Sequence, residues 1–376
     1  MKLLLITCFL FISINVHANT TEFRGIWVVT WEIFRDGKDG RFYSNEEIKK
    51  NIIKILDNIK LANLNNVMWQ VRQGATSYYK SSFEPWGKHL NYKAPNFDPF
   101  LFAIDQAHER GLKIHAWINT FEARDTSLGT PAQLHPEWIC RNKFNEIMPA
   151  KITLSPGMTE VKDYLKKIIF EIVNNYDLDG LHLDYIRWSE YPVGEDKSDE
   201  YVVGQYLFDL NHKYQVTPPD NFSTWGDWRR NQVTEFVKTI KKLIKRKKPA
   251  IVLSAAVIGK YNWGKWNGYY SAFQDSAKWY NENYIDLLIP MAYYEYSTDR
   301  LEKYLIKWNS FLQKKNKTKF ILGIGSLVLR QRDSWDNHFS LMEVTRQTSW
   351  VNGVQFFSYD DWEIEDFFND ARDLFN

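Results

Sequence analysis

The best candidates for acid–base chemistry lie in one short segment near the middle of the chain. Residues 179–188 read DGLHLDYIRW, an alternating strand that begins at a glycine and ends among polar side chains. Successive side chains of a strand point to opposite faces, so His182, Asp184 and Ile186 should share the inward face. A carboxylate then stands near the carboxyl end of the strand, close to Arg187. A salt bridge or a loop cap would use the same residues, so the surrounding elements must decide between these interpretations.

Two periodicities alternate along the rest of the chain. Short apolar and β-branched runs predict strands at residues 24–31, 66–72, 113–121, 180–188, 250–258, 285–294, 319–328 and 353–359. Helical spacing predicts helices at residues 45–64, 97–110, 159–176, 225–247, 271–281, 299–314, 337–349 and 364–375. The first helix has a capping box, because Ser44 precedes it and Glu47 follows three residues later.

Strict alternation of eight strands with eight helices predicts a parallel sheet closed into a (β/α)8 TIM barrel. An open doubly wound sheet is the alternative, but no Gly-rich phosphate turn follows the first strand. Long connections follow strands two to five, at residues 73–96, 122–158, 189–224 and 259–270. Because the active site of a barrel forms at the carboxyl ends of its strands, these loops should build a cleft there.

Composition and targeting signals narrow the class of protein. The chain has 376 residues, 44% of them hydrophobic, and a formal charge of +2. So small a net charge does not indicate nucleic-acid binding. Residues 1–18 have the layout of a secretory signal, an apolar run followed by a small residue at Ala18. We expect cleavage there, one domain over residues 19–376, no stable membrane span afterwards, and a periplasmic or secreted protein. Only Cys140 would remain, so no internal disulfide can form.

The polar residues at the predicted strand ends should converge at the mouth of the barrel. Glycoside hydrolysis needs two carboxyl groups that flank the scissile bond. We expect Asp184 and Glu295 to be this pair, with Glu32 and Glu122 as alternatives. The expected substrate contacts are Trp27, Glu32, Gln70, Arg72, Trp117, Asn119, His182, Arg187, Trp263, Tyr293 and Asp360.

Aromatic residues are abundant, with 16 Trp, 21 Tyr and 24 Phe. Flat rings suit the CH face of a sugar, and Trp263 and Trp266 in the loop after the fifth strand are the first candidates for such platforms. Packing of the long loops against the barrel is the alternative explanation for these rings.

Other catalytic classes find little support in the sequence. His115 and His182 lie on neighbouring strands, but each strand supplies only one inward histidine, so we expect neither a metal nor a cofactor. The sequence has no Gly-x-Ser-x-Gly turn, which a serine hydrolase of that type would need. No histidine lies at a spacing from Cys140 that would indicate a catalytic cysteine–histidine pair.

Four segments resemble the glycosyl-hydrolase-like ten family: RGIWV at residues 24–28, WQVR at 69–72, GLKIHAW at 111–117 and DGLHLDY at 179–185. The resemblance extends from about Glu22 to about Asp361. It implies a (β/α)8 glycosidase. Bacterial envelope members of this family include an enzyme that cuts peptidoglycan glycan strands stripped of their peptides, so the resemblance implies a β-linked amino-sugar polymer as substrate.

The fourth strand is also similar to that of chitinase-type barrels, with two departures. His182 replaces an inner aspartate, and Ile186 stands in the place of the catalytic glutamate, so the proton donor of those enzymes is absent. The segment Met291-Ala292-Tyr293 resembles their sixth strand, which implies that Tyr293 contacts an acetamido group. The missing glutamate leaves two other functions open, a non-catalytic glycan-binding barrel and a metal-dependent polysaccharide hydrolase or deacetylase.

Overall fold

The structure is a computed structural model that describes residues 22–36, 39–141, 145–147, 152–188, 208–209, 211–212, 217–219, 221–313 and 316–375. The expected signal at residues 1–18 and much of the connection 189–224 lie outside these residues. No helix among the described residues is long and apolar enough to cross a membrane.

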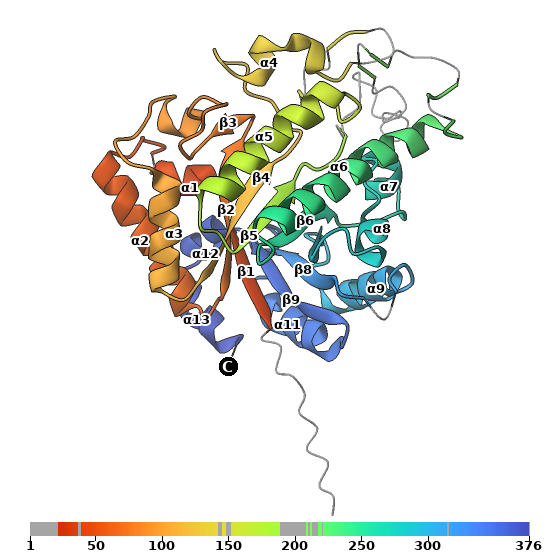
Figure 1. The fold of residues 1–376 in the computed structure, drawn as a ribbon. Coiled ribbons are helices and arrows are strands. Elements are labelled where there is room, and N and C mark those ends of the chain that lie inside the picture. Colours follow the sequence, from red (N-terminus) through yellow and green to blue (C-terminus); the bar gives the residue numbers. More distant parts are fainter. Residues whose placement is uncertain are drawn as a thin grey trace, which may run out of the picture.

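Eight parallel strands close into the predicted barrel, and the first strand lies beside the last (Figure 1). The strands are β1 (Phe23–Val28), β2 (Asn66–Gln73), β4 (Lys113–Asn119), β5 (Gly180–Asp184), β6 (Val252–Ile258), β7 (Leu287–Met291), β8 (Lys319–Gly325) and β9 (Val351–Phe357). A ninth, two-residue strand, β3 (Thr76–Ser77), pairs antiparallel with the end of β2.

Helices surround this ring (Figure 1). The long ones are α2 (Asn45–Leu61), α3 (Pro99–Glu109), α5 (Thr159–Asn175), α6 (Trp225–Lys247), α9 (Thr298–Asn309) and α11 (Asn337–Gln347). The shorter ones are α1 (Thr30–Phe34), α4 (Pro131–Leu134), α7 (Gly268–Ser271), α8 (Ser276–Asn281), α10 (Ser326–Gln331), α12 (Tyr359–Ile364) and α13 (Phe368–Asp373), with 3₁₀ turns η1 (Lys88–Leu90) and η2 (Pro136–Trp138).

Side-chain caps account for several helix starts. Ser44 and Glu47 form the predicted capping box of α2, and the Asp98 carboxylate accepts hydrogen bonds from two backbone amides of α3. The predicted first strand is too long, because Thr30 and the residues after it turn into α1. The closing helix predicted at residues 364–375 is shorter in the structure, where it is α13, and the additional helix α12 ends where the predicted one was expected to begin.

The barrel interior is filled by side chains from alternate strand positions. Trp27, Met68, Trp117, Ile289 and Ile321 belong to this inner cluster, which is separate from the larger cluster between the strands and the helices. The strand register sets Trp117 opposite His182, and His182 opposite Ser254. The predicted inward face of β5 is therefore correct for His182.

Ile186 does not share that face, so this part of the prediction is wrong. The chain leaves β5 after Asp184, and Tyr185 adopts a left-handed backbone conformation with φ of +46°. Strand alternation stops at this residue. Ile186 is consequently buried in the cluster outside the barrel, and its carbonyl accepts a hydrogen bond from Gln274 at 3.2 Å.

Candidate active site

Asp184 is the last residue of β5 and pairs in register with Asn119, the last residue of β4. Its side chain is almost buried, and Oδ1 accepts hydrogen bonds from the Tyr185 amide at 2.6 Å and from Arg187 Nη1 at 3.3 Å. The Arg187 guanidinium also lies 4.2 Å from the centre of the Tyr185 ring. These donors stabilise negative charge on the carboxylate and fix its orientation at the mouth of the barrel.

Tyr293, just after β7, lies close to Asp184. Its ring stacks on Phe357 with centroids 5.1 Å apart and meets Trp27 edge-on at 6.2 Å. Burial raises the pKa of Tyr293 well above its usual value, and the nearby charge of Asp184 raises it further. The phenol therefore stays neutral and can donate a hydrogen bond to a ligand at this point.

Trp27 and His182 lie one layer below, completely enclosed by the barrel. The Trp27 indole N–H donates to His182 Nε2 at 3.0 Å, so the proton of the imidazole is on Nδ1, which lies 2.8 Å from Ser254 Oγ. Burial lowers the pKa of His182 well below its usual value, and the ring is neutral. Both residues were expected to touch substrate, but in the structure they support the mouth from beneath. In the described part of the chain, the buried Nε1 of Trp117 has no hydrogen-bond partner.

Gln70, Arg72 and Asn119 hold the wall of the barrel. Gln70 accepts hydrogen bonds from the Thr30 amide and hydroxyl and donates to Asn119 Oδ1 at 3.3 Å. Arg72 forms a fork of hydrogen bonds with Glu84 at 2.7 to 3.1 Å, and neither side chain is exposed. Arg72 Nη1 also donates to the backbone carbonyls of Asn119 and Thr120, at the end of β4. Arg72, expected to bind substrate, is thus occupied within the protein.

Glu295 follows Tyr293 in the same loop and has only 10% of its side chain exposed. Burial raises the pKa of this carboxyl, while Arg300, at 3.6 Å, and Lys260 partly oppose the shift. The cations near Glu295 therefore come from α9 and from the loop after β6. The carboxylate of Asp184 has a different cation, Arg187.

The two alternative acids differ in charge state. Burial pushes the pKa of Glu122 upward, but Arg124 and hydrogen bonds from Asn119 and Gly74 outweigh it and hold the pKa below the usual value. Burial raises the pKa of Glu32 to about 8, although three donors favour its ionised form. Glu122 is therefore unsuited to donate a proton near neutral pH.

Glu32 joins the ends of the first and last strands. Its Oε2 accepts from the Val29 amide at 2.6 Å, and its Oε1 accepts from Ser358 Oγ at 2.8 Å and from the Asp360 amide at 3.0 Å. Burial also raises the pKa of Asp360. Glu32 thus caps two turns of the chain at the mouth of the barrel. The spacing of residues along the sequence gives no sign of this role.

Trp263 packs against the outer helices. Its ring stacks on Phe311 with centroids 5.8 Å apart and meets Tyr304 and Trp308 edge-on. Such contacts attach the loop after β6 to α9, which is the packing explanation considered for this ring. Trp266 is the more exposed tryptophan of this loop.

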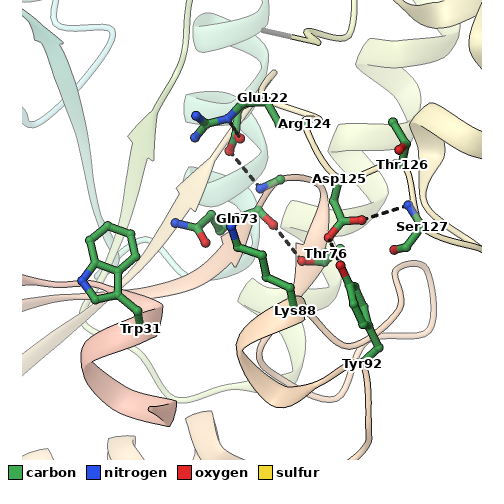
Figure 2. Close-up of a pocket in the computed structure, with 11 residues that line it drawn as sticks. Trp31, Gln73, Thr76, Lys88, Tyr92, Glu122, Arg124, Asp125, Thr126 and Ser127 are labelled. Carbon is green, nitrogen blue, oxygen red and sulfur yellow. Dashed lines mark hydrogen bonds and ion pairs between the residues drawn. The ribbon is translucent and has the colours of Figure 1, made fainter. Parts of the chain in front are cut away.

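A polar cleft of about 760 Å³ opens between the loops that follow β1, β2 and β4 (Figure 2). It is called the rim cleft below. Its lining residues are Trp31, Gln73, Gly74, Thr76, Lys88, Tyr92, Glu122, Arg124, Asp125, Thr126 and Ser127. Only Glu122 was singled out from the sequence. The other residues lie in loops whose meeting depends on barrel closure, so periodicity gives no signal for them.

Among the described residues, no group of three or more His, Cys, Asp or Glu side chains is placed to hold a metal ion. His115, one of the two inward histidines, is fully buried with Nε2 3.1 Å from Asn66 Oδ1. Its ring lies across Gly180, where an added Cβ would come within 1.9 Å of Nδ1. Cys140 is buried, and burial raises the pKa of its thiol. Neither residue offers a reactive group at the mouth.

Comparison with known proteins places this chain in a family. The family model described as "Glycosyl hydrolase-like 10" matches residues 22–339. Glycosyl hydrolase YngK of Bacillus subtilis is 27% identical over 307 residues, which cover 75% of this chain and 57% of that protein. Glycosyl hydrolase DigH of Escherichia coli K12 is 25% identical over 345 residues, which cover 82% of this chain and 74% of that protein.

Solved structures share the barrel at low sequence identity. The glycoside hydrolase domain of PgaB (BpsB) from Bordetella bronchiseptica has a TM-score of 0.63 at 13% identity, covering 94% of this chain and 99% of that one. An α-amylase from Geobacillus thermoleovorans has a TM-score of 0.53 at 13% identity, covering 93% and 78%. These similarities concern the fold.

Proposed function

Because the chain belongs to the glycosyl hydrolase-like 10 family, we propose that it is an exported glycoside hydrolase that cleaves glycosidic bonds in a polysaccharide of the bacterial envelope. The observation that carries the proposal is the position of Asp184. Its carboxylate ends β5 at the mouth of the barrel, is oriented by Arg187 and the Tyr185 amide, and lies close to the neutral phenol of Tyr293.

Hydrolysis of a glycosidic bond needs a proton donor for the leaving oxygen and a carboxylate for the oxocarbenium-like transition state. Asp184 supplies the carboxylate in this proposal. Glu295 supplies the proton, because burial raises the pKa of its carboxyl and so favours the protonated form that a general acid needs. Water completes the reaction by adding its hydroxyl to the anomeric carbon, and its remaining proton restores the acid.

The proposed substrate is a β-linked amino-sugar polymer, with the glycan strand of peptidoglycan as the leading candidate. The Tyr293 hydroxyl is a neutral donor beside a carboxylate, an arrangement that suits the carbonyl oxygen of an acetamido group. The family resemblance points to the same substrate class. Export follows from the signal layout of residues 1–18 and would place the enzyme in the periplasm or outside the cell.

Turnover of defined polymers tests this function. The protein lacking residues 1–18 is incubated with peptide-free glycan strands, with intact peptidoglycan and with cellulose, and new reducing ends are counted. We expect reducing ends from the peptide-free strands and none from cellulose. Binding to the strands without new reducing ends would instead identify a glycan-binding barrel, and loss of activity on chelation would identify a metal-dependent hydrolase.

A further inference from the structure

The rim cleft connects to the candidate catalytic carboxylate through a run of side-chain contacts. The Arg124 guanidinium lies 5.9 Å from the centre of the Tyr185 ring. Arg187 covers the same ring at 4.2 Å and bonds Asp184 at 3.3 Å. A polymer with its scissile bond at Asp184 would therefore place a neighbouring unit near the rim cleft.

The two carboxylates of the rim cleft are already bound within the protein. Asp125 accepts hydrogen bonds from the Tyr92 hydroxyl at 3.1 Å and from the Ser127 amide at 2.9 Å (Figure 2). Glu122 is bound by Arg124 and by the Gly74 amide. Both carboxylates are therefore engaged by donors of the protein, and Arg124 offsets the charge of Glu122.

Lys88 is the cation of the cleft that remains available. Its side chain is exposed and has no hydrogen-bond or ion-pair partner within the described residues. Figure 2 shows it extending into the space between Trp31 and Tyr92. An anionic group that enters the cleft can pair with this ammonium without displacing any existing contact.

Trp31 provides a flat surface at the same place. The residue is 42% exposed, although its ring makes an edge contact with His89 at a centroid distance of 6.1 Å. Trp31 also lines a second, smaller cleft of about 300 Å³ that contains Glu32 and Asp360. An exposed indole between two clefts suits a chain of sugar rings better than it suits a compact core.

We infer that the rim cleft is a subsite for an acidic amino-sugar unit, whose carboxylate pairs with Lys88 while its ring stacks on Trp31. The inference rests on the proposed function and adds to it a preference within the polymer. Glycan strands freed of peptides carry such a carboxylate on the lactyl ether of every second sugar. Intact strands have that group blocked by an amide bond.

Two forms of one polymer test the subsite. Peptide-free strands are used either with free lactyl carboxylates or after conversion of these groups to methyl amides. Cleavage is measured with the wild-type protein and binding with the Asp184→Asn protein. We expect KM and Kd to be about five-fold lower for the carboxylate form, the order given by one partly exposed ion pair. Lys88→Gln should remove this difference by raising the values for the carboxylate form to those of the amide form.

Matched variants separate the subsite from general effects. Lys93→Gln removes the same charge from an exposed position in the same loop that does not line the cleft, and it should keep the preference. Trp31→Ala should weaken binding of both polymers several-fold, and Trp31→Phe should restore much of it. Equal binding of the two polymers by the wild-type protein, or an equal loss on both in Lys88→Gln, would overturn the inference. Carboxylate-dependent binding without cleavage would retain the subsite and reject the proposed hydrolase.

Discussion

Two arginine–glutamate pairs lie near the carboxyl ends of the neighbouring strands β2 and β4, yet their surroundings differ. Arg72 and Glu84 are both completely buried. Glu122 is buried too, but Arg124 keeps 44% of its side chain exposed and lines the rim cleft. The same residue types at strand ends therefore serve two purposes. One pair holds the wall together, and the other presents a charged group to whatever enters the mouth.

The contrast extends to the other polar residues of the site. Gln70 and His182 have their hydrogen-bonding atoms engaged within the barrel wall and interior. Asp184, Arg187 and Tyr293 meet at its open end. We expect changes in the wall to lower stability, and changes at the mouth to lower activity. Each prediction below tests one side of this division.

Replacement of Asp184 should have the largest effect on rate. Asp184→Asn keeps the size of the side chain but removes the charge, so we expect turnover of peptide-free strands to fall by about 10² to 10⁴-fold. The melting temperature should change little. Asp105→Asn, an exposed position on α3, serves as the control. Near wild-type turnover in Asp184→Asn would remove this residue from the catalytic assignment.

Replacement of Arg72 should have the largest effect on stability. Arg72→Met leaves Glu84 as a buried charge without its partner, a change that typically costs about 3 to 5 kcal/mol in the free energy of unfolding. Denaturant titration measures this loss. The double variant Arg72→Met with Glu84→Leu should recover most of it.

The partly exposed pair Arg124–Glu122 is the comparison for the Arg72→Met experiment. Arg124→Met leaves Glu122 with its hydrogen bonds from Gly74 and Asn119, and partial exposure of the arginine weakens the ion pair. We expect a loss of about 1 kcal/mol or less. Equal losses in Arg72→Met and Arg124→Met would contradict the division between wall and mouth.

Buried neutral histidines should make stability depend on pH. Burial lowers the pKa of His115 and of His338 to about 4. Between about pH 6.5 and pH 4 the unfolded chain binds more protons at these sites than the folded protein does. The free energy of unfolding should therefore fall as pH falls through this window, by roughly 1.4 kcal/mol per pH unit for each histidine. A slope that stays the same in His338→Gln would contradict this explanation.

The smallest expected effect concerns the proton donor. Arg300 favours the ionised form of Glu295, so Arg300→Gln should raise the pKa of this carboxyl. If Glu295 donates the proton, the alkaline limb of the pH–activity profile should move upward by about 0.2 to 0.7 pH units. Lys303→Gln on the same helix, where Lys303 pairs with Asp299, should leave the limb in place. An unmoved limb in Arg300→Gln would direct the search to another donor.

The fold was predictable from sequence because its signals are local. Helical and strand periodicities and the capping box at Ser44 depend only on neighbours in the chain, and all eight barrel strands were located. The depth of each side chain was not predictable in the same way. Alternation puts His182 and Asp184 on one face, but whether either reaches the mouth depends on where β5 ends against β4.

Partners from distant loops explain the remaining differences. Arg72 was expected at the mouth, but Glu84 arrives from the loop after β3 and buries it. Ile186 was expected to face inward, but the left-handed turn at Tyr185 breaks the alternation. Trp31 and Lys88 share the rim cleft only because two loops meet after the barrel closes. Spacing along one strand carries no information about these encounters.

The hydrogen bonds of Glu32 have a consequence for the order in which the protein forms. They join residues separated by 326 and 328 positions in sequence, Ser358 and Asp360. Contacts of such separation form late, because the entropy of closing a long loop must be overcome first. During synthesis, Asp360 therefore leaves the ribosome long after Glu32. A chain interrupted between Glu295 and Ser358 would possess Asp184, Tyr293 and Glu295 but would lack the seam that closes the barrel around them.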